Sequence, residues 1–122
     1  MTREEVDRWL ERYVAAWKSN DPEQIGDLFS EEAQYRYWPG DEPRVGREAV
    51  VSAWLGEGDE PGTFEASYSC WALDGSRAVA SGTSTYTVPD HVVYDNVFLL
   101  VFDDEGRCAE FTDVYLKRPQ PS

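Results

Sequence analysis

The chain has 122 residues, a mass of 13.9 kDa and a formal net charge of −13, from 24 acidic and 11 basic residues. That charge repels phosphate backbones and anionic lipid headgroups, so we expect neither nucleic acid nor a membrane surface as a partner. An apolar fraction of 41% with 14% aromatic residues excludes a disordered chain and is enough for one packed domain at this length.

Two helices are predicted at the N-terminus. The first covers Arg3–Ser19, where Thr2 and Glu5 can form a capping box. Its apolar residues recur at helical spacing: Val6, Leu10, Tyr13, Val14 and Trp17. The second, shorter helix follows at once, with Asp21 as its cap and Pro22 in its first position. Its apolar stripe consists of Ile25, Leu28 and Phe29.

A strand and a third helix follow. Residues 33–38 alternate around Tyr35 and Tyr37 until Pro39 and Gly40 break the pattern, which predicts a strand. Helical spacing returns over 46–55 and is ended by Gly56. The acidic, glycine-rich segment 57–62 is predicted to be a loop.

The C-terminal half has the two-residue period of strands. Four strands are predicted, over residues 63–73, 77–88, 92–102 and 107–117. Short turns at 74–75, 89–90 and 103–106 separate them, which predicts an antiparallel meander. Three helices before four long strands, with one strand between the helices, indicate an α+β fold in a single domain over 1–118 with a tail at 119–122.

Several signals are absent from the sequence. The first residues carry no apolar signal core and no apolar run is long enough to span a membrane, so we expect a cytoplasmic protein. Cys70 and Cys108 have no metal-ligand spacing and are expected to be buried free thiols, with a disulfide as the alternative. Without a phosphate-binding glycine loop, a nucleophile elbow or a metal cluster, we expect no cofactor and no metal.

Asp113 is the main candidate for chemistry. Strand alternation places it on one face with Ala109, Phe111 and Tyr115, and places Cys108 on the other. Burial among rings would raise the pKa of this carboxyl toward working pH, as a general acid/base requires. The alternative is a structural carboxylate that is hydrogen-bonded to backbone or to a tyrosine.

Other residues are candidates for ligand contacts. Asn96 on the preceding strand could orient a ligand carbonyl, with Asp95 as the alternative if the register differs. Trp38 and Trp54 offer flat apolar area for a pocket, although most tryptophans of a small domain belong to its core. His91, the only histidine, lies in a turn where exposure to solvent is expected.

The order of elements resembles the SnoaL-like branch of the nuclear transport factor two superfamily. The resemblance is carried by residues 35–39, by the Gly-Arg-Glu-Ala sequence at 46–49 and by the final Phe111-Thr112-Asp113. It implies three helices packed on a curved, mostly antiparallel sheet, a cone with an internal pocket (a cystatin-like α+β barrel), and homodimers formed through the sheets. This superfamily hosts many activities, so it does not fix the reaction.

The resemblance also suggests site residues. Tyr35 and Asp113 are similar to the water-positioning tyrosine and the base aspartate of limonene epoxide hydrolases, but Tyr37 stands where those enzymes have asparagine. Their arginine and second aspartate have no counterpart at residues 80–85. The resemblance is therefore nearer to the SnoaL-like polyketide cyclases, which use a single aspartate.

The expected site is a pocket for a small apolar or weakly polar metabolite. Asp113 and Tyr35 are its predicted catalytic residues. Its predicted ligand-binding residues are Tyr37, Trp38, Trp54, Asn96, Phe111 and Tyr115. The expected function is that of an isomerase, cyclase or hydratase. The alternative is a noncatalytic ligand-binding or dimerisation module of the same fold.

Overall fold

A computed structural model describes residues 1–56, 64–87 and 91–119. They form three helices and one six-stranded sheet, which confirms the predicted α+β class. The helices are α1 (Arg3–Ser19), α2 (Pro22–Asp27) and α3 (Arg47–Gly56). The strands are β1 (Phe29–Arg36), β2 (Arg44–Val45), β3 (Phe64–Asp74), β4 (Arg77–Tyr86), β5 (Val92–Phe102) and β6 (Cys108–Lys117).

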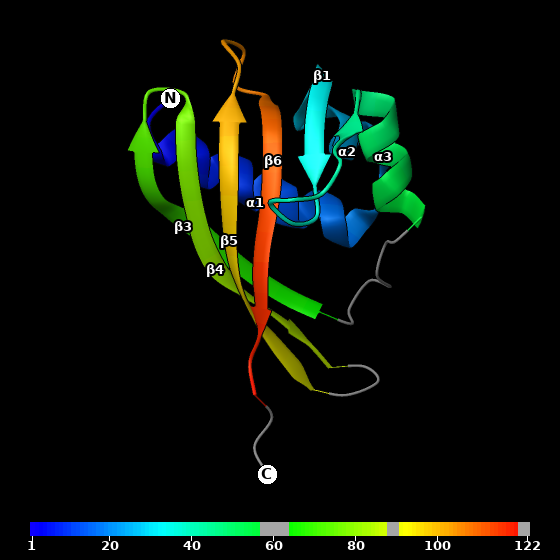
Figure 1. The fold of residues 1–122 in the computed structure, drawn as a ribbon, viewed down its shortest axis with the longest axis vertical. Coiled ribbons are helices and arrows are strands. Elements are labelled where there is room, and N and C mark those ends of the chain that lie inside the picture. Colours follow the sequence, from blue (N-terminus) through cyan, green and yellow to red (C-terminus); the bar gives the residue numbers. More distant parts are fainter. Residues whose placement is uncertain (57–63, 88–90, 120–122) are drawn as a thin grey trace.

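The sheet is mixed and curved, with the helices on one side (Figure 1). Its order is β2-β1-β6-β5-β4-β3, in which β3 to β6 form the predicted antiparallel meander and β1 runs parallel to β6. The two edge strands, β2 and β3, do not pair with each other in the described residues. The predicted barrel is therefore an open curved sheet, and we call the side that faces the helices its concave face.

The helix caps match those predicted from the sequence. Thr2 accepts a hydrogen bond from the Glu5 amide at 3.1 Å, and the Glu5 carboxylate accepts one from the Thr2 amide at 3.0 Å. Asn20 ends α1 in the left-handed conformation, with φ of 54°. Asp21 then caps α2 by accepting from the Glu23 amide at 2.9 Å. Both caps follow from short-range chemistry, which is why sequence alone predicts them.

The first strand starts earlier than predicted. Residues 33–38 were expected to form it, but β1 begins at Phe29, which pairs with Cys108 of β6. The Cys108 amide also donates to the Leu28 carbonyl at 2.8 Å, so a strand distant in sequence extends β1 backward. The two-residue β2 was not predicted. The predicted loop at 57–62, the turn at 89–90 and residues 120–122 of the predicted tail lie outside the described residues.

The core lies between α1 and the concave face. Trp9 anchors α1, since its indole N–H donates to the Leu28 carbonyl at 3.0 Å. Asp7 accepts from the Cys70 amide at 2.7 Å and so joins α1 to β3. The fully buried rings on the sheet side of this core are Phe29, Phe98 and Phe111. None of the helices in the described part of the chain is long and apolar enough to cross a membrane.

A β-bulge changes the faces of β6. Cys108 pairs with Phe102, whereas Phe111 pairs with Leu100, so Ala109 is an extra residue in the ladder. Cys108 is therefore buried on the same side as Phe111, and its predicted position on the opposite face is wrong. Cys70 and Cys108 are both buried free thiols, as predicted.

Candidate functional site

Polar residues gather on the concave face beside the aromatic core. The buried polar side chains of the described residues are Ser84, Asn96 and Thr112, with 3%, 7% and 9% exposure. Ser84 and Asn96 lie on the concave face together with Asp113, which is half-buried. In Figure 1 the strands that carry them continue past α1 toward the lower end of the sheet.

A chain of hydrogen bonds links these residues and is called the polar chain below. It runs from Tyr68 on β3 to Ser84 on β4, Asn96 on β5 and Asp113 on β6. Ser84 Oγ donates to Asn96 Oδ1 at 3.0 Å, and Asn96 Nδ2 donates to Asp113 Oδ1 at 3.5 Å. Because Ser84 binds the carbonyl oxygen of Asn96, the amide nitrogen is the atom that Asn96 presents to Asp113.

Gly82 allows the first link of the polar chain. A Cβ at this position would lie 2.0 Å from the Ser67 carbonyl oxygen and 2.6 Å from Tyr68 Cδ1. The Tyr68 ring therefore lies against the backbone of β4, with its hydroxyl at Ser84 two residues further along that strand. Any side chain at position 82 would displace this ring.

The environment of Asp113 favours its protonated form. Burial raises the pKa of this carboxyl from 3.8 to about 6, while the hydrogen bond from Asn96 opposes the rise. All 11 basic side chains lie within the described residues, and none of them stabilises the charged form of Asp113. The carboxyl is thus poised to exchange protons near neutral pH.

Three tyrosines on other elements are affected by the charge of Asp113. Burial is the largest cause that raises the pKa of Tyr13, Tyr35 and Tyr68, and the charge of Asp113 contributes to each rise, so all three stay neutral. Tyr35 shares a hydrogen bond with Tyr13, and the indole N–H of Trp54 donates to its hydroxyl oxygen. Tyr35 is therefore held by Tyr13 and Trp54, and it feels the charge of Asp113 from a distance.

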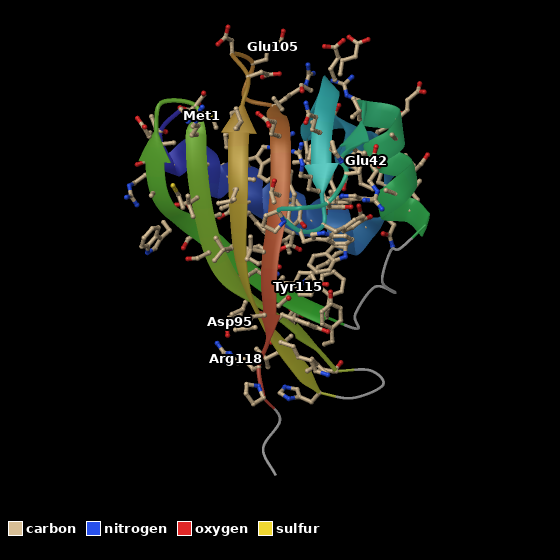
Figure 2. All side chains as sticks on the ribbon, viewed as in Figure 1. Met1, Glu42, Asp95, Glu105, Tyr115 and Arg118 are labelled. Carbon is tan, nitrogen blue, oxygen red and sulfur yellow. The ribbon has the colours of Figure 1, made fainter. Side chains whose placement is uncertain are left out.

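Aromatic rings form the wall on both sides of Asp113. The Phe111 ring is parallel to Tyr35, with 4.7 Å between centroids, and contacts Phe98 at 4.8 Å. On the other side Tyr115 is 54% exposed and lies 5.8 Å from Tyr94. Figure 2 shows Tyr115 on the part of β6 beyond α1. Asp113 therefore lies between a buried apolar wall and an exposed tyrosine rim.

The predicted ligand residues fall into different places. Asn96, Phe111 and Tyr115 lie on the concave face with Asp113, whereas Asp95 points to the opposite face and pairs with Arg118 at 2.7 Å. Trp54 is buried in contact with the Tyr35 ring. Tyr37 is half-buried and packs on Tyr35 at 5.2 Å, but Trp38 is 54% exposed in the turn after β1. His91 is exposed, as predicted.

The sequence did not single out Tyr13, Tyr68 or Ser84. Tyr13 was assigned to the apolar stripe of the first helix, where its ring does pack. Strand alternation assigns Tyr68 and Ser84 to a face of their own strands, and it is the only signal that could have found them. Their link depends on the register of β3 with β4, which alternation does not give.

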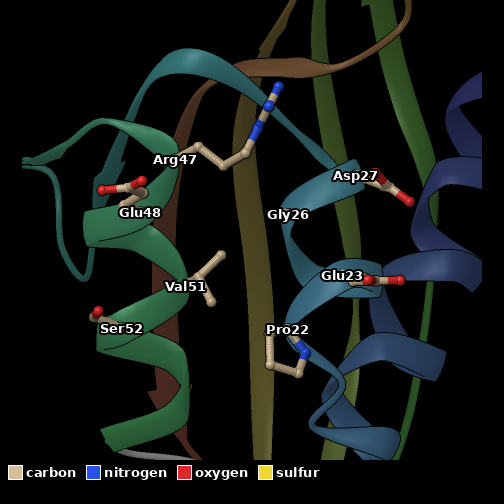
Figure 3. Close-up of a pocket in the computed structure, with 8 residues that line it drawn as sticks. All are labelled: Pro22, Glu23, Gly26, Asp27, Arg47, Glu48, Val51 and Ser52. Atoms are coloured by element: carbon tan, nitrogen blue, oxygen red, sulfur yellow. The ribbon is translucent and has the colours of Figure 1, made fainter.

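Two surface grooves lie away from the polar chain. One, of about 550 Å³, separates α2 from α3 and carries the exposed carboxylates of Glu23, Asp27 and Glu48 (Figure 3). Its Arg47 donates two hydrogen bonds to the Phe29 carbonyl, at 3.0 and 3.1 Å, and so joins α3 to β1. The other, of about 360 Å³, lies on strands β3 to β6 and includes Leu99. The described residues hold no cluster of three or more possible metal ligands.

The comparisons with known proteins agree with this architecture. A family model for the SnoaL-like domain matches residues 10–111. A solved structure from Burkholderia xenovorans LB400, titled an NTF-2 like protein of unknown function, superposes with a TM-score of 0.74 at 16% identity. The superposition covers 98% of this chain and 88% of that one, so the two share a fold. No curated protein matches the sequence significantly.

Proposed function

The chain belongs to the SnoaL-like domain family, and on that premise we propose that its concave face binds a small organic molecule and that Asp113 exchanges a proton with it. The observation that carries this proposal is the half-buried carboxyl itself. It lies on an aromatic face, is reached by the Asn96 amide, and has a pKa raised to about 6 by burial. These are the properties of a general acid/base that works near neutral pH.

The polar chain supports different roles for the two oxygens of the Asp113 carboxyl. Asn96 binds Oδ1 of Asp113, so Oδ2 is the oxygen that takes up and releases the proton. The ionised carboxylate removes a proton from a carbon next to a ligand carbonyl, and the resulting acid returns it at another atom. Buried rings such as Phe111 keep water from one side of the carboxyl, while its exposed side lets the proton exchange with solvent. Proton shifts of this kind serve isomerisation, cyclisation and hydration.

The proposal is tested by binding and by proton exchange. A thermal-shift screen of small cyclic ketones and enones identifies ligands, because ligands raise apparent stability by mass action. NMR in D₂O then measures the exchange of their acidic C–H protons. Asp113→Asn should bind the ligand within about tenfold of wild type and lose the exchange. Asp95→Asn, a matched carboxylate on the opposite face, should retain both.

Two results would contradict the proposal. One is the absence of any stabilising ligand in a broad screen. The other is C–H exchange that continues unchanged in Asp113→Asn, because the proton acceptor would then be another group.

A second candidate, a noncatalytic dimerisation module, is favoured by the convex face of the sheet. Large apolar side chains are exposed on this face, namely Val97, Leu99, Val114 and Leu116. Leu99 is one of the residues that line the 360 Å³ groove. Exposed apolar patches of this kind mark protein interfaces, so we propose a homodimer through the sheets. Sedimentation at micromolar concentration should give a dimer mass, and a monomer would contradict this candidate.

A further inference from the structure

Asp113 differs from the other half-buried aspartates in how its charge is satisfied. Those in the described residues are Asp7, Asp21, Asp41, Asp95 and Asp103. Each accepts at least one hydrogen bond of 2.9 Å or shorter, from a backbone amide or an arginine. Asp113 accepts from Asn96 at 3.5 Å, a long bond from a neutral donor. Its carboxylate is therefore the least satisfied of the set.

Three basic side chains near the ends of α1, β1 and β2 have partners other than Asp113. Lys18 at the end of α1 binds Glu65 at 3.0 Å, and Arg36 on β1 donates to Gln34 at 3.2 Å. Arg44 on β2 pairs with Asp41. The titratable groups that face Asp113 from α1, β1 and β3 are the neutral Tyr13, Tyr35 and Tyr68. The protein thus supplies no counter-ion for this carboxylate within its described residues.

The surroundings of Asp113 are suited to a cation. Tyr115, two residues along β6, is 54% exposed and lies 5.8 Å from the half-buried Tyr94, while the buried Phe98 and Phe111 keep the opposite side of the carboxyl apolar. Ring faces attract ammonium and guanidinium groups, most strongly where water is scarce. The same aromatic cluster already shows this preference at its edge, where the Arg44 guanidinium lies 4.5 Å from the centre of the Tyr37 ring. A net charge of −13 adds a general attraction for cations.

We infer that the ligand of the concave face carries a protonated amino group, which binds beside Asp113 as its counter-ion while the apolar body of the ligand packs on the accessible rings of Tyr115 and Tyr94. This inference rests on the proposed binding site and is independent of the proposed proton transfer. An anionic ligand would meet the repulsion of Asp113. A neutral ligand would lack this charge-assisted contact and bind more weakly.

A matched pair of probes tests the inference. The pair is (1-naphthyl)methylamine and 1-naphthalenemethanol, which have the same aromatic body and differ in charge. Calorimetric titration at pH 7.5 should give at least tenfold tighter binding of the amine to the wild type. Asp113→Asn, which keeps the shape of the side chain, should bind both probes equally. Asp95→Asn removes one negative charge from the opposite face and should keep the preference.

The pH dependence gives a second readout. The amine stays protonated between pH 5 and 7, whereas Asp113, with its pKa of about 6, becomes ionised over that range. Amine affinity should therefore rise roughly tenfold from pH 5 to pH 7, and alcohol affinity should stay constant. This rise should be absent in Asp113→Asn.

The outcomes separate the inference from the proposed function. Equal binding of amine and alcohol to the wild type overturns the inference and leaves the binding site intact. An amine preference that survives in Asp113→Asn also overturns it, because another group would then hold the charge. If neither probe binds at millimolar concentration, both the inference and the proposed site are contradicted.

Discussion

The two ends of the concave face are built by the same strands and serve different purposes. At the end covered by α1, Ala78, Leu100 and Phe102 are at most 3% exposed and belong to the core cluster around Trp9. At the other end the same strands carry Ser84 and Asn96, and β6 carries Asp113. The same strands therefore supply apolar core residues at one end and the polar chain at the other.

This difference has an energetic side. The covered end buries apolar area, which stabilises the fold. The open end holds a carboxylate in surroundings that disfavour its charge, which destabilises the fold at neutral pH. Substitutions at the covered end should therefore weaken the protein, whereas removal of the charge at the open end should strengthen it.

Gly82 lies directly opposite Asn96 in the sheet and should be the most sensitive position. Gly82→Ala brings a methyl group against the Ser67 carbonyl and the Tyr68 ring, so the strands must separate. We expect a loss of about 4 kcal/mol in the free energy of unfolding, measured by urea denaturation. Gly56→Ala, where nothing lies within 4 Å, is the control. A loss under about 1 kcal/mol at position 82 would show that the register is more tolerant than described.

The covered end is tested by adjacent leucines on opposite faces of β5. Leu100 is 2% exposed and Leu99 is 42% exposed. Leu100→Ala leaves a cavity and should cost about 3 kcal/mol by urea denaturation. Leu99→Ala should cost under about 1 kcal/mol. Equal losses would contradict the assignment of faces.

The open end is tested by Asp113→Asn, which should stabilise the protein at pH 7 by about 1–2 kcal/mol after allowance for partial exposure. The raised pKa of Asp113 means that the folded state holds its proton more tightly than the unfolded state. Wild-type stability should therefore fall, relative to the variant, as pH rises from about 4 to about 6, and the gap should stay constant above that. Urea denaturation across this range measures the gap.

The reference for this pH series is Asp95→Asn. Asp95 is paired with Arg118, which lowers the pKa of its carboxyl, so its removal should not stabilise the protein. A gap between wild type and Asp113→Asn that closes as pH rises would contradict the described environment of Asp113.

The smallest effect is expected for the link between Tyr68 and Asn96. Ser84→Ala removes the hydroxyl that binds both, and should cost about 1 kcal/mol by urea denaturation. Ser81→Ala, on the opposite face of the same strand, should change stability by under about 0.5 kcal/mol. If the two variants behave alike, the polar chain contributes nothing to the fold.

Local chemistry made much of the fold predictable. The capping box at Thr2 and the helical spacing that follows gave the bounds of α1, and unbroken alternation gave those of β5. The start of β1 was missed because Phe29 continues the apolar spacing of the preceding helix, while its partner Cys108 is far away in sequence. Strand β2 has two residues and too little pattern to detect.

The candidate site was predictable only where alternation along a single strand places its residues on one face. Alternation along single strands placed Asp113 with Phe111, and Asn96 with Phe98. The role of Ser84 depends on the pairing of three strands, so no single segment shows it. Trp38 was grouped with the pocket because of its flat apolar area beside the loop, but the turn after β1 directs it to solvent.

The most direct test of the account is the pKa of Asp113, read from its side-chain carboxyl ¹³C shift between pH 3 and pH 8. We expect a value of about 6, because the carboxyl is half-buried without a counter-ion. A value near 3.8, the ordinary value for an aspartate, would show a solvated carboxyl, and the concave face would then have no acid/base to offer.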